Sequence, residues 1–117
     1  MADLLEELLN QDFSVWITSD HGNIEAVGFG LSSEGVIADV RGARARIYSD
    51  ELLRRQIGKA IPGAIEWPSI GLPDDYLALL APSRSAFSKE GEHIVGHGGA
   101  TIEEIVVPLV EVTRRVT

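Results

Sequence analysis

Two short segments of this sequence carry side chains that could bind a divalent metal ion. The first is Asp20-His21, which follows an apolar run and precedes a glycine. A carboxylate and an imidazole on one tight turn can converge on a single cation, one through oxygen and the other through a ring nitrogen. The second is His97, which has a glycine before it and two glycines after it. Absent side chains at these positions would allow backbone and ligand to approach closely.

Each candidate also has a simpler interpretation. Asp20 is typical of a turn in which its carboxylate caps a backbone N–H and His21 is exposed, and a single histidine such as His97 is more often a loop residue than a ligand. His93 and His97 have the spacing of helical zinc sites, but Ile94 stands where such sites need a glutamate. The glycines around His97 also disfavour a helix.

A cluster of arginines is the third candidate site. On a strand, Arg44 and Arg46 would face the same side and could hold phosphate or nucleic acid through bidentate contacts. With Arg41, Arg54 and Arg55 they make up half of the ten basic residues. The alternative is a solvated face that balances nearby acidic side chains. A net charge of -8 argues against a general binder of nucleic-acid backbones, whose surface is normally basic.

The elements that must position these residues alternate between helix and strand. Leucines at helical spacing predict an amphipathic helix over residues 2–9, and residues 13–18 have the apolar character of a buried strand. Asp20-His21 would thus follow the end of a strand, where open α/β sheets typically hold their sites. We expect Trp16 and Trp67 in the core, because they lie in apolar runs without interleaved basic residues.

The rest of the chain gives further local signals. Strands are predicted at residues 35–40, 43–48 and 76–80, with a shorter one at 64–67 inside a loop over 61–75 and another loop over 81–92. Ser49 and Asp50 predict the start of a helix that ends near Gly58. Thr101 and Glu104 match a capping box, which predicts a short helix before a final strand over residues 105–112. Pro108 should push that strand toward an edge or a bulge.

In this order the segments resemble a known family. Residues 15–23 resemble the strand and Asp-His-Gly motif of the alkaline phosphatase superfamily, which includes the cofactor-independent phosphoglycerate mutases. Residues 96–109 resemble that superfamily's last metal histidine, with its short helix and closing strand. Residues 41–48 resemble the arginine-rich segment of PglZ domains, a branch named from a bacterial phage growth limitation system. The chain therefore looks like the C-terminal portion of a PglZ-type domain, as a single domain over residues 1–117.

The resemblance implies an α/β fold, as a fragment of the superfamily's three-layer αβα sandwich. It also implies part of a metal-dependent phosphatase or phosphodiesterase, with two divalent cations, zinc or manganese, that clamp a phosphoryl group. Asp20 and His21 would bind one cation and His97 the other. The nucleophile and the remaining ligands normally come from earlier in the fold, and residues 1–12 cannot supply them. We therefore assign no catalytic residue and expect the isolated chain to be an inactive fragment or a degenerate relative.

The alternative function is a non-catalytic interaction module in phage defence, which contacts a partner protein or nucleic acid through the arginine face. The expected partners are the upstream portion of its own domain and other defence proteins. Cysteine is absent, so any metal must be held by His, Asp or Glu. The apolar runs are too short to span a bilayer and the N-terminus has no signal-peptide pattern, so we expect a cytoplasmic protein without membrane contact.

Overall fold

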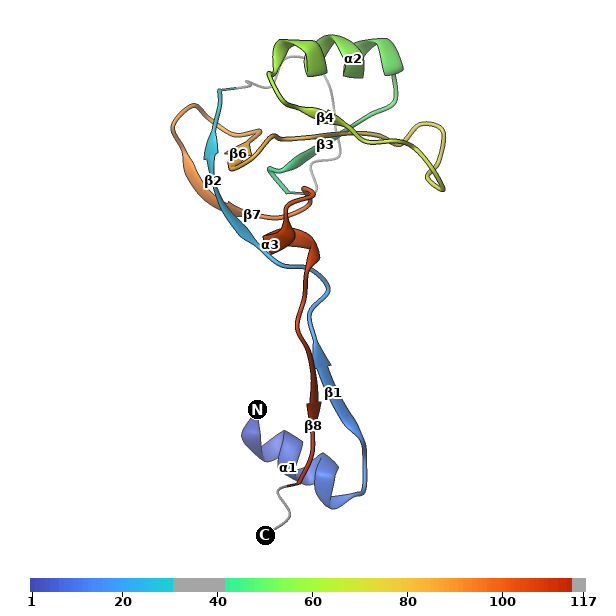
Figure 1. Ribbon diagram of the computed structural model, residues 1–117, viewed down its shortest axis with the longest axis vertical. Coiled ribbons are helices and arrows are strands. Elements are labelled where there is room, and N and C mark those ends of the chain that lie inside the picture. Colours follow the sequence, from blue (N-terminus) through green and yellow to red (C-terminus); the bar gives the residue numbers. More distant parts are fainter. Residues whose placement is uncertain (31–41, 115–117) are drawn as a thin grey trace.

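The computed structural model describes residues 1–30 and 42–114, which form an elongated molecule. Figure 1 shows a rounded body that holds most of the strands, and a narrow stalk that leads from it to a helix near the N-terminus. The longest dimension is 62 Å, against 33 and 21 Å for the other two. The radius of gyration of 19.2 Å exceeds the roughly 13 Å of a compact domain of this length. The strand predicted at residues 35–40 and Arg41 lie outside the described residues.

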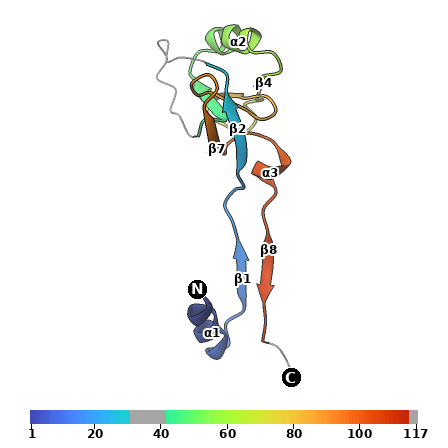
Figure 2. The same ribbon diagram turned by 90° about the vertical axis from the view of Figure 1, so that its left-hand side faces the viewer.

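The stalk is a ribbon of two antiparallel strands, β1 (Val15–Thr18) and β8 (Leu109–Val112). Figure 2 shows the two strands side by side below the body. The prediction of a strand here is confirmed, but the prediction that it is buried is wrong, because Trp16 keeps 55% of its surface exposed. Within residues 1–30 and 42–114, β1 pairs with β8 alone. A two-stranded ribbon offers no second layer against which its apolar side chains could pack.

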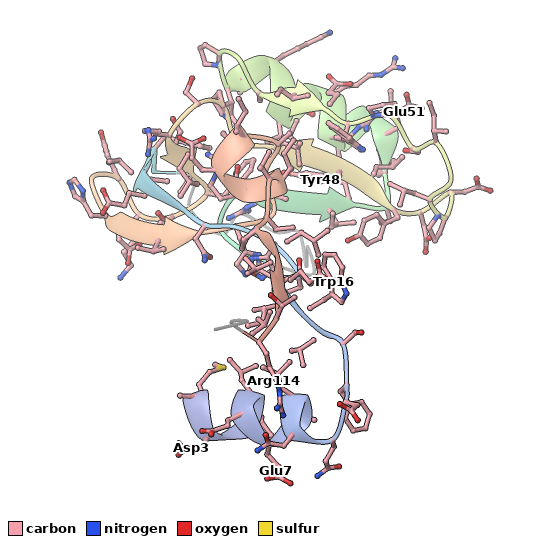
Figure 3. The ribbon with its side chains drawn as sticks, turned by 60° about the horizontal axis from the view of Figure 1, so that its bottom comes forward. Asp3, Glu7, Trp16, Tyr48, Glu51 and Arg114 are labelled. Atoms are coloured by element: carbon pink, nitrogen blue, oxygen red, sulfur yellow. The ribbon has the colours of Figure 1, made fainter. Side chains whose placement is uncertain are left out.

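Helix α1 (Ala2–Asn10) confirms the helix predicted from the leucine spacing, although none of its residues is buried. Arg114, which follows β8, lies against the end of this helix in Figure 3. Its Nη2 donates to the carbonyl oxygen of Leu9 at 2.8 Å. A basic side chain at a helix C-terminus satisfies carbonyl groups that have no partner within the helix and interacts favourably with the helix dipole.

One sheet of the body has the strand order β6-β2-β7. Strand β2 (Ile24–Gly28) pairs antiparallel with β7 (His93–Gly96) and parallel with β6 (Ser85–Ala86). Burial alternates along β2, which is the pattern of a strand with one face on the core. β6 lies inside the predicted loop over residues 81–92, because two residues are too few to give a recognisable strand pattern.

The other sheet of the body has the order β3-β5-β4 and is antiparallel throughout. Strands β3 (Ala45–Tyr48), β4 (Ile65–Glu66) and β5 (Leu77–Leu80) confirm three predicted strands. The core lies between this sheet and α2 (Glu51–Ala60), which Figure 1 shows above it, and it is centred on the fully buried Leu79. The expectation that Trp67 belongs to the core is wrong, because 43% of it is exposed.

Side-chain caps fix the starts of the two helices in the body. The Oδ1 of Asp50 accepts the backbone N–H of Leu53 at 2.9 Å, which confirms the predicted start of α2. The helix continues two residues beyond Gly58. Helix α3 (Ile102–Ile105) has the predicted capping box, in which Thr101 and Glu104 satisfy each other's backbone N–H groups.

The closing strand is shorter than predicted. Ile105 belongs to α3, and β8 begins only at Leu109, directly after Pro108. Proline has no N–H to donate to a sheet, so a strand that contains it internally would lose a ladder hydrogen bond.

The described elements mix helices and strands, in agreement with the expected α/β class. They form three small sheets of two, three and three strands, and the three-layer sandwich remains implied by the resemblance alone. None of the helices described here is long and apolar enough to cross a membrane.

Candidate metal centre

Asp20 and His21 lie in the loop that joins the stalk to the body, between β1 and β2. The Oδ1 of Asp20 accepts the backbone N–H of His21 at 3.0 Å, and the Ser19 hydroxyl donates to the His21 carbonyl at 2.6 Å. On the other side of His21, the backbone N–H of Gly22 donates to the carbonyl oxygen of Glu104 at 2.8 Å. The loop is therefore held by hydrogen bonds before and after the imidazole.

The His21 ring directs one nitrogen to the backbone and leaves the other for a ligand. Its Nδ1 lies 2.9 Å from the carbonyl oxygen of Gly22, so Nδ1 carries the proton and donates it. In the neutral ring that makes this contact, Nε2 is the nitrogen with a lone pair, and it lies 3.7 Å from Oδ2 of Asp20. Two atoms that bind one tetrahedral zinc ion at about 2.0–2.2 Å lie roughly 3.4 Å apart. The Asp20-His21 pair thus has the donor types and nearly the spacing that one cation requires.

Strand β7 brings His97 to the same place. Its register with β2 pairs Gly96 with Ile24, so His97 continues from β7 toward the loop that contains His21. The two imidazole rings are stacked, with their centroids 3.9 Å apart and 19° between their planes. The structure therefore gathers Asp20, His21 and His97, although most of the chain lies between the two histidines.

The described residues do not complete a metal centre by themselves. Among residues 1–30 and 42–114, no group of three or more His, Cys, Asp or Glu side chains could hold one metal ion. Zinc in proteins usually has four ligands, or three protein ligands and a water molecule at a catalytic site. Asp20 and His21 fit part of one such site and His97 offers a nitrogen beside it, so further ligands would have to come from elsewhere.

His93 is the third histidine and lies apart from this cluster. It opens β7 opposite Val27 and is exposed. Residues four apart on a strand are roughly 13 Å apart along it, so His93 and His97 cannot share an ion. The prediction that these two histidines do not form a helical zinc motif is confirmed.

Arg44, which we expected on an arginine face, is entirely buried. Its Nε donates to Oε1 of Glu104 at 2.9 Å and its Nη2 to Oε2 at 3.2 Å, while Nη1 donates to the carbonyl of Ser85. Arg54 is buried too, and its Nη1 donates to the carbonyl of Trp67 at 2.9 Å. Arg44 and Arg54 therefore do not belong to an exposed arginine face, because both guanidinium groups have partners inside the body.

The remaining arginines differ from one another. Arg46 is half-buried, and its guanidinium carbon lies 5.4 Å from the centroid of the Phe87 ring. Arg55 is exposed and pairs with Glu51 one helical turn earlier, as a solvated face would. Of the two residues proposed to bind anions, only Arg46 keeps access to solvent, and that role stays a prediction.

Glu104 is the residue near the site whose importance the sequence did not reveal. The sequence predicted its capping role, and its Oε2 does accept the backbone N–H of Thr101 at 3.2 Å. The structure adds that Glu104 is only 2% exposed and that it accepts the backbone N–H of Gly99 at 3.0 Å. Burial alone would raise the pKa of Glu104, but hydrogen bonds from Arg44, Thr101 and Gly99 outweigh that effect and lower it to about 2.

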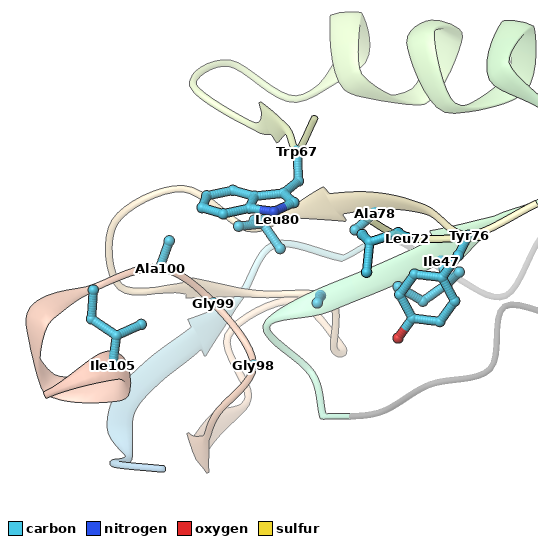
Figure 4. A pocket seen from close by; sticks show the side chains of 11 residues that line it. Ile47, Trp67, Leu72, Tyr76, Ala78, Leu80, Gly98, Gly99, Ala100 and Ile105 are labelled. Carbon is cyan, nitrogen blue, oxygen red and sulfur yellow. The ribbon is translucent and has the colours of Figure 1, made fainter. Parts of the chain in front are cut away.

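An apolar pocket of about 320 Å³ adjoins the glycine loop after His97. Figure 4 shows Trp67 and Leu80 on one side of it, Ile105 of α3 on another, and Gly99 between them. Its lining contains no charged residue. The pocket therefore offers no charged side chain to pair with a phosphate.

Comparison with known proteins identifies a family but no individual relative. No curated protein matches this chain. No solved structure matches it either. The family described as the BREX system PglZ alkaline phosphatase-like domain matches residues 1–112, which is nearly the whole chain. This match confirms the resemblance that the Asp20-His21 and His97 segments indicated, and the chain therefore belongs to the PglZ family of alkaline phosphatase-like domains.

Proposed function

We propose that this chain supplies part of the bimetal site of a metal-dependent phosphatase or phosphodiesterase that acts in phage defence. One observation carries the proposal: Asp20, His21 and His97 converge, with the two imidazole rings 3.9 Å apart. The pairing of β7 with β2 brings the two histidines together, and both remain partly accessible to solvent. Their meeting in a chain of the PglZ family supports a shared chemical role.

In this proposal Asp20 and His21 hold one divalent cation, zinc or manganese, and His97 holds a second. The His21 Nε2 serves as the ligand atom because Nδ1 donates to the Gly22 carbonyl, which also fixes the orientation of the ring. A pair of bound cations stabilises the attacking and leaving oxygens of a phosphoryl group during in-line transfer.

The chain does not act alone in this proposal. The described residues provide too few ligands, so an upstream portion of the same domain supplies further ones together with a Ser or Thr nucleophile. The two hydroxyls that directly precede Asp20 in the chain are engaged by the backbone: Thr18 contacts the carbonyl of Ser19 at 3.5 Å, and Ser19 contacts that of His21. We assign a nucleophilic role to neither. Of Arg44 and Arg46, the two arginines expected to bind anions, Arg46 is the one that keeps access to solvent and could hold a phosphate.

Metal binding by this chain tests the proposal directly. Calorimetric titration with zinc or manganese should reveal weak binding to the wild type, because missing ligands leave water in their place. Asp20→Ala and His97→Ala should each weaken it by more than about tenfold, since even an outer-shell partner can have that effect. The matched control is His93→Ala, which removes an exposed imidazole outside the cluster and should change nothing. Equal affinity in all four proteins would contradict the metal assignment.

A second candidate is a non-catalytic module of a cytoplasmic defence protein that contacts a partner. The exposed apolar side chains of the stalk, such as Trp16 and Leu109, favour a protein partner. The net charge of -8 and the burial of Arg44 and Arg54 argue against nucleic acid. Indifference to metal, together with binding of another defence protein, would support this candidate over the first.

A further inference from the structure

One residue contacts both loops that carry the candidate ligands. The backbone carbonyl of Glu104 accepts the N–H of Gly22, directly after His21, at 2.8 Å. Its carboxylate accepts the N–H of Gly99, two residues after His97, at 3.0 Å. A displacement of Glu104 would therefore act on both loops at once.

The carboxylate of Glu104 is held by more donors than a helix cap requires. A capping box needs the carboxylate to accept only the backbone N–H of Thr101, which lies 3.2 Å from Oε2. The Thr101 hydroxyl donates to the same oxygen at 2.8 Å. Arg44 adds a two-pronged contact, and Gly99 adds a fifth donor. Burying an ion pair this deeply is costly unless the geometry is good and the remaining lone pairs are satisfied. The start of a four-residue helix does not explain why so many donors hold this carboxylate. The need to keep the two loops in fixed positions does explain it.

The glycines of both loops are explained by this packing. A Cβ atom on Gly22 would lie 1.8 Å from the backbone oxygen of Glu103, and one on Gly99 would lie 2.5 Å from Oε2 of Glu104. A Cβ on Gly96 would lie 3.1 Å from Cγ of Arg44. The loops therefore lie directly against α3 and its ion pair, with no room for a side chain between them.

We propose that Glu104, fixed by Arg44, is a positioning residue that holds His21 and His97 side by side. The importance of this positioning role for catalysis rests on the proposed function. The contact between the two imidazole rings can be measured without any metal. Glu104 acts through its hydrogen bonds with the backbone of Gly22 and Gly99.

The test compares Glu104→Gln with Arg54→Gln in this chain. Glutamine keeps the size of the side chain but puts an NH₂ group where every neighbour is a donor. Arg54→Gln is the matched control, because it removes a buried guanidinium from the other side of the body, where it pairs with Glu66. In histidine-selective NMR of the wild type, the ring protons of His21 and His97 should show a mutual nuclear Overhauser effect, and exposed His93 provides the reference. That effect should be lost in Glu104→Gln and kept in Arg54→Gln.

Zinc titration of the same proteins gives the second measurement. Glu104→Gln should bind zinc about tenfold more weakly than the wild type, which is the size of effect typical of groups that orient a ligand. Arg54→Gln should bind as the wild type does. If zinc binds to none of them while the contact between the rings still depends on Glu104, then the proposed function fails and the positioning role stands.

Thr101→Val covers the case in which Glu104→Gln does not fold. This variant removes one hydroxyl donor to Oε2 and leaves the ion pair intact, so it should fold and weaken the signal between the two rings. Survival of the full ring contact in Glu104→Gln would overturn the proposal. If that variant is unfolded, an undiminished contact in Thr101→Val would overturn it equally.

Discussion

Glu104 keeps its negative charge inside the protein because protein donors replace the water that it loses on folding. Arg44 provides charge as well as hydrogen bonds, while Thr101 and Gly99 provide backbone and hydroxyl donors that do not titrate. The ionisation of Glu104 is therefore the variable part of this cluster.

Acid should destabilise the protein through Glu104. Its folded-state pKa of about 2 lies below the ordinary value of 4.5, so the ionised form favours the folded state. This contribution, on the order of 3 kcal/mol, is complete above about pH 4.5 and is lost as the pH falls toward 2. Urea unfolding measured across this range should show the loss in the wild type and a much smaller loss in Glu104→Gln.

The neighbouring Glu103 provides the control for this prediction. It pairs with Arg84 at 2.6 Å, but both side chains are about half exposed, and such pairs are worth roughly 0–1 kcal/mol. Glu103→Gln should therefore follow the wild-type curve. An acid dependence that persists unchanged in Glu104→Gln would show that other carboxylates cause it.

The roles of single residues could be predicted from the sequence where neighbouring residues form a recognisable motif. Asp20, His21 and His97 stand in short segments with recognisable neighbours, and the structure brings them together. The partner of Arg44 lies 60 positions away, so spacing along a strand said nothing about it. The arginine therefore looked like part of an exposed face when it belongs to the interior.

At the scale of elements, the helices are short and depend on their caps. Helices of fewer than about 12 residues are marginal in isolation, and α2 has ten residues while α3 has four. Each begins with a side chain that satisfies a backbone N–H. Local capping thus contributes directly to the stability of the body.

Removing the cap of α2 should cost measurable stability. Asp50→Ala deletes the acceptor of the Leu53 N–H, and the loss of an N-cap typically lowers the free energy of unfolding by about 1 kcal/mol. Asp75→Ala removes an exposed loop carboxylate and should be nearly neutral, which makes it the matched control. Chemical denaturation of both variants at neutral pH provides the comparison. Equal stability of the two would mean that the cap does not hold the helix.

The elements themselves were largely predictable, since their signals are local. Periodic leucines, a capping box and an Asp N-cap located α1, α3 and α2. The prediction that β1 is buried was wrong. An apolar run has the same sequence pattern whether the residues that would pack against it belong to the described chain or lie elsewhere. Trp16 shows the consequence: it is as apolar as a core residue and yet largely exposed.

The whole molecule exposes more surface than a compact protein of its mass. Its accessible area is 8482 Å², whereas a monomer of 12.7 kDa has about 6,200 Å². The difference exceeds the roughly 800 Å² that one partner contributes to an interface of standard size. The stalk contributes Trp16, Ile17, Leu109 and Val110 to the exposed apolar side chains. This surface supports the proposal that another part of the domain packs against β1 and β8, next to the loop that holds Asp20 and His21.

We therefore expect the isolated chain to fold and to bind metal weakly without catalysing hydrolysis. The body has its own core around Leu79, so folding does not require the proposed upstream portion. Hydrolysis would require it, because a bimetal site needs several ligands for each cation and an attacking group, and the described residues contain no group of three or more ligands that could hold a metal ion.

The measurement is an assay of phosphate monoesters and diesters with excess zinc or manganese, beside an Asp20→Ala control. No metal-dependent turnover above that control is expected. In a longer PglZ chain that contains the upstream portion, turnover should appear, and Asp20→Ala and His97→Ala should each abolish it while His93→Ala retains it. Turnover by the isolated chain that Asp20→Ala lacks would mean that this chain, or a second copy of it, completes the site. The stalk would then need another explanation for its exposed apolar surface.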